Sequence, residues 1–267
     1  MAASNRKAGN SGPESVVGTQ TIGRALAVLR VLRDTPADVG VTEIARALEL
    51  HTSTVHRMVR ALVAAGYVAQ DPHTERYRLG REAFLLGHIA GRALGFDAAM
   101  PLLESLAETT GESVNLVVRD GDHGLVVLRV DSQQPLRFAQ QVGARIPMYC
   151  TSTGKALLAF SGDREGEVAR VGELERLTPT TITSPRGLLE DLEKTVARGF
   201  AINECERVPG VCGVAAPVLT ADGRASAALA VQGPQIRLSE NRIAELGPLV
   251  VESARMVAAT SPRAYGL

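Results

Sequence analysis

Tryptophan is absent from the 267-residue sequence, and Phe, Trp and Tyr together make up only 3% of it. Any core must therefore be built from aliphatic side chains, and an apolar content of 45% is enough to build one. No apolar run approaches the roughly 18 residues that cross a bilayer, so we expect no membrane partner.

Cysteine is scarce as well. Cys150, Cys205 and Cys212 form no CxxC pair, and an odd count is typical of a reducing compartment. Two interpretations of Cys205 stay open, a redox-sensitive thiol and a small hydrophobic side chain, and the second is the commoner one. Residues 1–19 are polar and contain no apolar signal segment, which predicts a disordered tail and a cytoplasmic protein. Clustered metal ligands are missing from the sequence, and we expect neither a metal nor a cofactor.

The net charge is zero, which argues against a uniformly basic surface. The charge is unevenly distributed, however. Residues 1–80 carry 10 Lys and Arg against 7 Asp and Glu, whereas the rest carries 19 against 22. This mild basic bias at the N-terminus is weak evidence for a nucleic-acid partner.

Residues 20–80 predict a winged helix-turn-helix domain. Apolar residues recur at helical spacing over 21–33, 43–48 and 52–65, and Gly66 is placed to end the third helix. Two short strands follow at 67–70 and 76–79 around a turn. Three helices and then a hairpin is the element order of a winged DNA-binding domain.

The third of these helices carries the polar face that DNA recognition requires, because the major groove admits one helix and is read by residues near its N-terminus. No Asp or Glu falls between residues 50 and 70, as a phosphate-facing surface demands. The alternative is an ordinary solvated three-helix unit. We predict DNA contacts, including two from the wing, at Thr52, Ser53, Thr54, His56, Arg57, Arg60, Arg76 and Arg78.

The remaining sequence predicts a linker helix over residues 81–95 and a second domain over 96–262. Helices are expected at 97–110, 151–160, 185–198 and 239–259. Strands are expected at 113–118, 125–130, 137–142, 200–203, 214–219 and 225–231. This mixture predicts an α+β fold in which helices flank an antiparallel sheet.

These segments together resemble the IclR family of bacterial transcriptional regulators. The resemblance runs from about residue 20 to 260 and is carried by Arg24-Ala-Leu-Ala-Val-Leu29, Thr52-Ser-Thr-Val-His-Arg57, Tyr77-Arg-Leu-Gly80, Thr153-Gly-Lys-Ala-Leu-Leu-Ala159, Ala215-Ala-Pro-Val218 and Gly233-Pro234. It implies a GAF-like effector-binding domain and homodimers or homotetramers on a palindromic operator. Most relatives repress transcription, and some activate it.

The resemblance also implies a pocket for a small-molecule effector such as an organic or aromatic acid. Carried over by position, its lining is Pro135, Phe138, Ser152, Thr153, Asn203, Val211, Gly213, Ala230 and Gln232. Backbone N–H groups at the start of the 151–160 helix, with Ser152, Thr153 and Lys155, offer donors for an anion. Simple core packing is the alternative for each residue.

A second class of function is an enzyme with a catalytic C-terminal domain and a winged partner-binding module. Ser152-Thr-Gly-Lys155 matches the S-x-x-K nucleophile motif of serine β-lactamases, but the companion motifs are missing. With no coherent set of nucleophile, base and acid, we expect no catalytic residues and a protein that is not an enzyme.

Overall fold

A computed structural model of the chain describes residues 20–35, 37–138 and 140–260. The chain divides into two units between Ile89 and Ala90. The predicted tail, residues 1–19, and the last two residues of the predicted second domain, 261 and 262, lie outside the described residues. Within the described ranges, none of the helices combines the length and apolar content that a membrane crossing requires.

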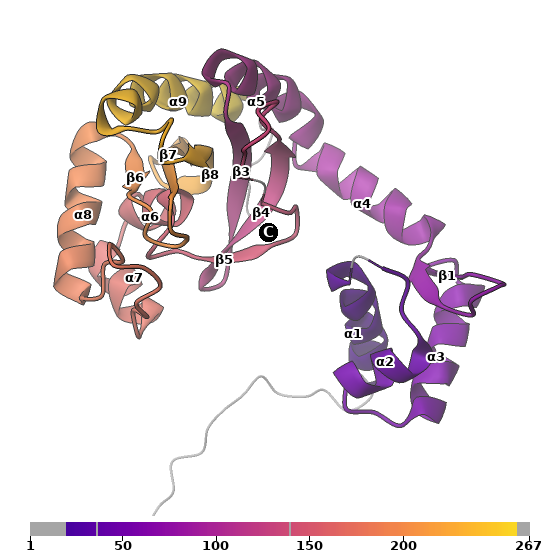
Figure 1. Cartoon of the computed structure of the whole chain (residues 1–267). Coiled ribbons are helices and arrows are strands. Elements are labelled where there is room, and N and C mark those ends of the chain that lie inside the picture. The colour runs from indigo at the N-terminus through magenta and orange to yellow at the C-terminus, as the bar shows by residue number, and fades with distance from the viewer. Residues whose placement is uncertain (1–19, 36, 139, 261–267) are drawn as a thin grey trace, which may run out of the picture. The chain divides into compact units, whose positions relative to one another are not determined.

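The first unit is a three-helix domain with a two-stranded wing (Figure 1). The two strands pair antiparallel, with Val68 opposite Leu79 and Gln70 opposite Tyr77. This order confirms the predicted winged helix-turn-helix. Its elements are α1 Gln20–Asp34, α2 Val41–Ala47, α3 Thr52–Ala64, β1 Val68–Gln70 and β2 Tyr77–Leu79.

Helix α3 lies in this unit with one apolar side inward. Val55, Met58 and Val59 are buried at positions i, i+3 and i+4, and they pack into one cluster with Val28 of α1 and Ile44 of α2. Because this stripe occupies the inner side, the polar residues between it must face outward. Gly66, with a φ of +78°, ends the helix in the left-handed conformation that favours glycine.

Helix α4, Arg81–Ala93, follows the wing, and none of its residues is buried. Its apolar side chains are largely exposed, with Phe84 at 71% and Ile89 at 63%. An exposed apolar stripe of this kind is typical of a surface that meets a partner.

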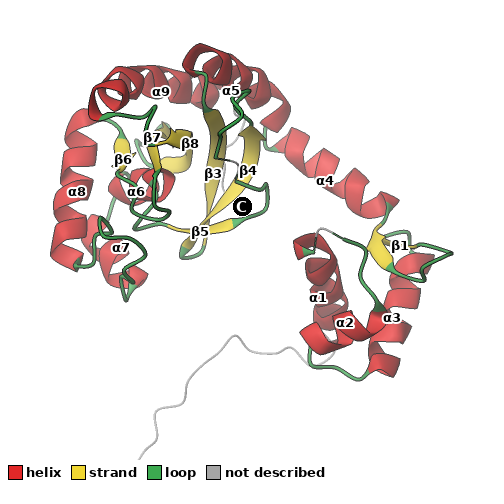
Figure 2. Ribbon diagram, in the orientation of Figure 1, coloured by secondary structure: helices red, strands yellow, loops and turns green. Residues whose placement is uncertain are grey.

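The second unit is a six-stranded antiparallel sheet with helices on both faces, which confirms the predicted α+β class (Figure 2). The strand order is β5-β4-β3-β8-β7-β6. The strands are β3 Ser113–Asp120, β4 His123–Val130, β5 Arg145–Pro147, β6 Ala201–Asn203, β7 Val211–Leu219 and β8 Ala225–Pro234. The helices are α5 Phe96–Thr110, α6 Ser152–Ala159, α7 Arg164–Val171, α8 Pro185–Arg198 and α9 Glu240–Thr260.

The two faces of the sheet carry separate cores. Alternation along β3 sends Val114, Leu116 and Val118 into the core that contains α5 and α9, and Val117 into the core that contains α6 and α8. Every residue of α6 is buried. We call the side of the sheet that contacts α6 the α6 face.

One predicted strand is wrong and one helix was not predicted. The described residues of 137–142 form no strand; β5 lies later in the chain, where Leu125 of β4 faces Arg145. The backbone carbonyl of Gln140 instead accepts a hydrogen bond from the Arg129 side chain (3.1 Å), which replaces a ladder partner. Helix α7 is short and polar, so it shows little apolar periodicity.

Candidate functional site

The outward side of α3 is a row of polar side chains without partners. Thr52, Ser53, His56, Arg57 and Arg60 are exposed, and no side chain of this row forms a hydrogen bond or ion pair with another described residue. Thr54 is half-buried. The structure therefore brings six predicted residues onto one helix face, where their donors are free to meet base edges or phosphates.

A hollow of about 490 Å³ lies between α1 and α3, beside this row. Arg57 and Thr54 line it from α3, and Arg24 lines it from α1. Sequence reasoning missed Arg24, because a single arginine in an amphipathic helix carries no signal of what it faces. The two guanidinium groups give the lining of this hollow a positive charge.

The wing arginines are held differently from those of α3. Arg76 donates from Nε to the Asp38 carbonyl and from NH2 to Glu43 Oε2, both at 2.7 Å. Arg78 pairs with the Asp38 carboxylate at 2.9 Å. The backbone N–H of Gly40, followed by Arg76, holds the pKa of Glu43 below its ordinary value. A phosphate contact from either arginine must compete with these ion pairs.

The predicted effector residues gather mainly on the α6 face. Two rows cross the sheet there: Arg129, Asn115, Ala230, Ala215 and Ala201 in one, and Ser113, Gln232, Gly213 and Asn203 in the next. A Cβ atom on Gly213 would lie 3.2 Å from Ser152 Oγ, so the start of α6 touches the second row. Val211 is half-buried at the start of β7, whereas Pro135 is exposed and Phe138 half-buried outside the sheet.

Several polar atoms on this side of the sheet are buried without partners. Among the described residues, no hydrogen bond reaches Ser152 Oγ, Thr153 Oγ1, Asn115 Oδ1 or Gln140 Nε2. Buried polar groups are normally satisfied, so each exception needs a reason, such as a ligand or water. Sequence reasoning missed Asn115 and Gln140; the signal for Asn115 was a lone amide between Val114 and Leu116 in an apolar strand.

Lys155 is not a free donor for an anion. Its ammonium lies 2.6 Å from Glu206 Oε1 and 2.9 Å from Asp191 Oδ2, and its side chain is 1% exposed. Burial raises the pKa of Glu206, although the charge of Lys155 opposes this shift. The three residues join α6, α8 and the loop after β6 through a buried charge network.

Two cysteines are paired, contrary to both interpretations of Cys205, which treat it as unpaired. Cys205 and Cys212 form a disulfide with their Cα atoms 4.6 Å apart. It closes the loop between Asn203 and Gly213. Cys150 is free and buried, and burial raises the pKa of its thiol to about 11, which favours the protonated form at neutral pH.

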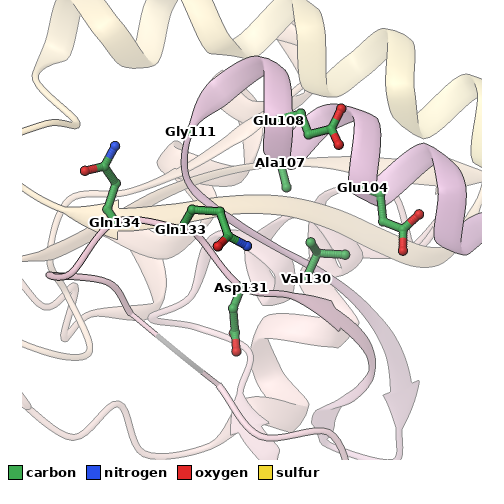
Figure 3. Close-up of a pocket in the computed structure, with 8 residues that line it drawn as sticks. All are labelled: Glu104, Ala107, Glu108, Gly111, Val130, Asp131, Gln133 and Gln134. Atoms are coloured by element: carbon green, nitrogen blue, oxygen red, sulfur yellow. The ribbon is translucent and has the colours of Figure 1, made fainter.

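A separate hollow of about 550 Å³ lies beside α5 and the end of β4 (Figure 3). Glu104 and Glu108 of α5 line it, and so does Asp131 from the connection after β4. It shares no residue with the predicted effector set. Asp131 is paired with Arg129 at 2.6 Å, but Glu104 and Glu108 would still repel an organic anion, so this hollow does not suit the predicted ligand.

The S-x-x-K pair is not assembled for catalysis. Ser152 Oγ has no hydrogen-bond partner among the described residues, and Lys155 is held by two carboxylates. No base is therefore positioned to take the Ser152 proton. Within the described ranges, His, Cys, Asp and Glu side chains nowhere form a group of three that could hold a metal ion.

Comparison with known proteins identifies both units. The family described as bacterial transcriptional regulator IclR C-terminal matches residues 95–259, and the IclR helix-turn-helix domain matches residues 21–72. The HTH-type transcriptional regulator BhcR of Paracoccus denitrificans is 36% identical over 251 residues, which cover 93% of this chain and 90% of that protein. The HTH-type transcriptional repressor AllR of Escherichia coli K12 is 30% identical over 251 residues, covering 92% of each.

A solved structure supports the fold. The chain is similar to an IclR homolog of Microbacterium hydrocarbonoxydans complexed with 4-hydroxybenzoate, with a TM-score of 0.80 at 23% identity, covering 90% of this chain and 98% of that one. The family matches confirm the resemblance found in the sequence. The matched families and both named relatives are transcriptional regulators and not enzymes.

Proposed function

Because the chain belongs to the IclR family of bacterial transcriptional regulators, we propose that it is a cytoplasmic repressor whose operator binding responds to a small organic or aromatic acid. Residues 20–80 bind a palindromic operator, residues 81–95 link the domains, and residues 96–262 bind the effector. AllR is named a repressor, which supports this sign of regulation.

The outward side of α3 is the observation that carries this proposal. A helix that leaves Ser53, His56, Arg57 and Arg60 exposed and unpartnered, with no acid in its sequence, is suited to the major groove. The N-terminal side chains Thr52, Ser53 and Thr54 contact bases or phosphates, and Arg24 adds a phosphate contact beside Arg57.

The effector binds on the α6 face, with its carboxylate at the start of α6. The free hydroxyls of Ser152 and Thr153 and the N-terminal end of the helix favour a negative group there. Gly213 lets the start of α6 approach the sheet closely, because a Cβ atom there would lie 3.2 Å from Ser152 Oγ, and Gln232 and Asn203 flank it in the same row. The Microbacterium homolog was solved with 4-hydroxybenzoate, an aromatic acid, which supports this class of ligand.

The active species is a homodimer, or a homotetramer formed from two dimers. Helix α4 exposes Phe84, Leu85, Leu86 and Ile89 without burying any of its own residues, and a second copy of this helix would cover them. The effector binds one arrangement of the two subunits better than the other, and this preference changes the spacing of the two α3 helices. Because the two half-sites of the operator lie at a fixed spacing, a small rotation of one subunit against the other lowers the affinity for the operator.

A footprint on the protein's own upstream DNA tests the proposal. We expect protection of two inverted half-sites whose centres lie about 10 base pairs, or a multiple of that, apart. A titration of benzoate-type and short aliphatic acids should weaken the footprint at constant protein concentration. Absence of binding to this DNA at low ionic strength contradicts the proposal.

A further inference from the structure

Two buried amide side chains face each other beside the α6 face. Asn115 is 4% exposed and Gln140 is 7% exposed, and Asn115 Nδ2 donates to Gln140 Oε1 at 3.1 Å. In each side-chain amide, one polar atom has no hydrogen-bond partner among the described residues: Asn115 Oδ1 and Gln140 Nε2. Exchanging N and O in both amides reverses their roles. Either way, one C=O and one NH₂ stay free.

This amide pair lies on the same side of the sheet as the proposed effector site. Asn115 is opposite Ala230 in β8, and Ala230 is opposite Ala215, the neighbour of Gly213 on the same face of β7. Two strand spacings separate Asn115 from β7, or about 10 Å. The side chain between them, Ala230, is small. A molecule with polar groups at both ends would need to span about this distance to join the start of α6 and the amide pair.

The one cation that the described residues show bonded to this pair's surroundings, Arg129, is itself engaged. The nearby Arg129 guanidinium donates to Asp131 at 2.6 Å and to the Gln140 carbonyl at 3.1 Å. An ionised carboxylate offers only acceptors, so one of its oxygens would face the free amide carbonyl. A primary amide offers one acceptor and one donor, which complements a free NH₂ and a free C=O.

We propose that Asn115 and Gln140 are specificity-determining residues that select effectors carrying a carboxamide or ureido group. This inference rests on the proposed function, because it assigns the far end of the same site. The effector's carboxylate lies toward Ser152 and Thr153, and its neutral amide end lies against Asn115 and Gln140. The ligand class is then a short half-amide of a dicarboxylic acid, or a ureido acid of similar length.

Calorimetric titration of the full chain with succinamate and with succinate tests the assignment. The two probes have the same carbon skeleton and differ only in the amide. We expect succinamate to bind about tenfold more tightly or better, because succinate leaves the amide pair unsatisfied. In Gln140→Met the preference should fall to about threefold or less, whereas Gln133→Met, an exposed glutamine in the same connection, should retain it.

Equal affinity of the wild-type protein for the two probes overturns the inference, as does a preference that survives in Gln140→Met. Failure of both probes to bind at millimolar concentration also overturns it, since water alone then satisfies the pair. Operator binding without effector, measured on the same samples, should be normal in every variant. Loss of operator binding by the wild type would instead contradict the proposed function.

Discussion

The outward side of α3 and the α6 face of the second unit both present polar groups without protein partners, but only one of them is in water. Ser53 and Arg57 are solvated, so their free donors cost no stability. Ser152 and Asn115 are 0% and 4% exposed, and each unsatisfied buried group costs about 1–3 kcal/mol. Changes on α3 should therefore alter binding without altering stability, whereas changes beneath α6 should alter both.

The largest expected effect is on the buried charge network. Lys155→Met leaves Glu206 buried without its cation and leaves the half-buried Asp191 with only Arg198 at 3.9 Å, which should lower the free energy of unfolding by about 3–5 kcal/mol. Urea denaturation measures this loss. The control Arg186→Met removes an exposed pair with Glu190 and should cost less than about 1 kcal/mol. Similar losses of unfolding free energy in the two variants would contradict the claim that buried charged groups matter more for stability than exposed ones.

The disulfide should give the next largest effect. Closing a loop of about eight residues stabilises a protein by roughly 2–3 kcal/mol in the chain-entropy model. We expect Cys212→Ala to lower the unfolding free energy by about this amount, and reduction of the wild type to do the same. Cys150→Ala, which removes the free buried thiol, should not change the response to reductant. A wild type that unfolds identically with and without reductant would contradict the pairing.

On α3 the expected effect is confined to DNA. Arg57→Ala should weaken operator binding by about 10- to 100-fold and relax base preference, since a bidentate base contact contributes about 1–3 kcal/mol. Fluorescence anisotropy at matched salt measures this change, and thermal unfolding should not move. Arg186→Ala serves as the control on the second unit. An unchanged isotherm, or a large loss of stability, would show that Arg57 belongs to the fold and not to a binding surface.

The contrast between α3 and the α6 face also explains how much of the fold and of the candidate site the sequence predicts. The apolar periodicity of α3 predicts both its buried stripe and its polar side, because local spacing decides which residues face outward. The α6 face was reached through a family resemblance, and six of the nine carried-over residues, Ser152, Thr153, Asn203, Gly213, Ala230 and Gln232, lie on or against it.

What the sequence did not predict depends on contacts between distant residues. Asn115 meets Gln140 and Lys155 meets Glu206 across 25 and 51 residues, and no local pattern marks either pair. The seven-residue spacing of Cys205 and Cys212 becomes meaningful only once the loop between β6 and β7 brings their Cα atoms together. The strand predicted at 137–142 is wrong because side chains, not a neighbouring strand, satisfy the Gln140 carbonyl.

A smaller effect is expected from removing the hydroxyl of a buried serine, Ser152, or of an exposed one, Ser53. Ser152→Ala removes a buried hydroxyl that has no protein partner, so the unliganded protein should be as stable as the wild type or about 1 kcal/mol more stable. The same variant should bind acidic effectors more weakly. Ser53→Ala on α3 should leave both properties unchanged and weaken only DNA binding. A clear loss of stability in Ser152→Ala, seen by thermal shift without ligand, would show that its hydroxyl is satisfied.

The smallest expected effect concerns Glu43, an exposed carboxylate that pairs with the wing arginine Arg76 at 2.7 Å. The Gly40 N–H and Arg76 lower the pKa of this carboxylate, so its contribution to stability is present above the ordinary value near 4.5 and is lost as pH falls through the lowered value. Glu43→Gln should therefore unfold slightly earlier than the wild type at pH 7, and the two should converge in acid. Because the variant frees Arg76, its affinity for nonspecific DNA should rise by less than about threefold. An affinity that falls instead would mean that the ion pair presents Arg76 to the phosphates rather than withholding it.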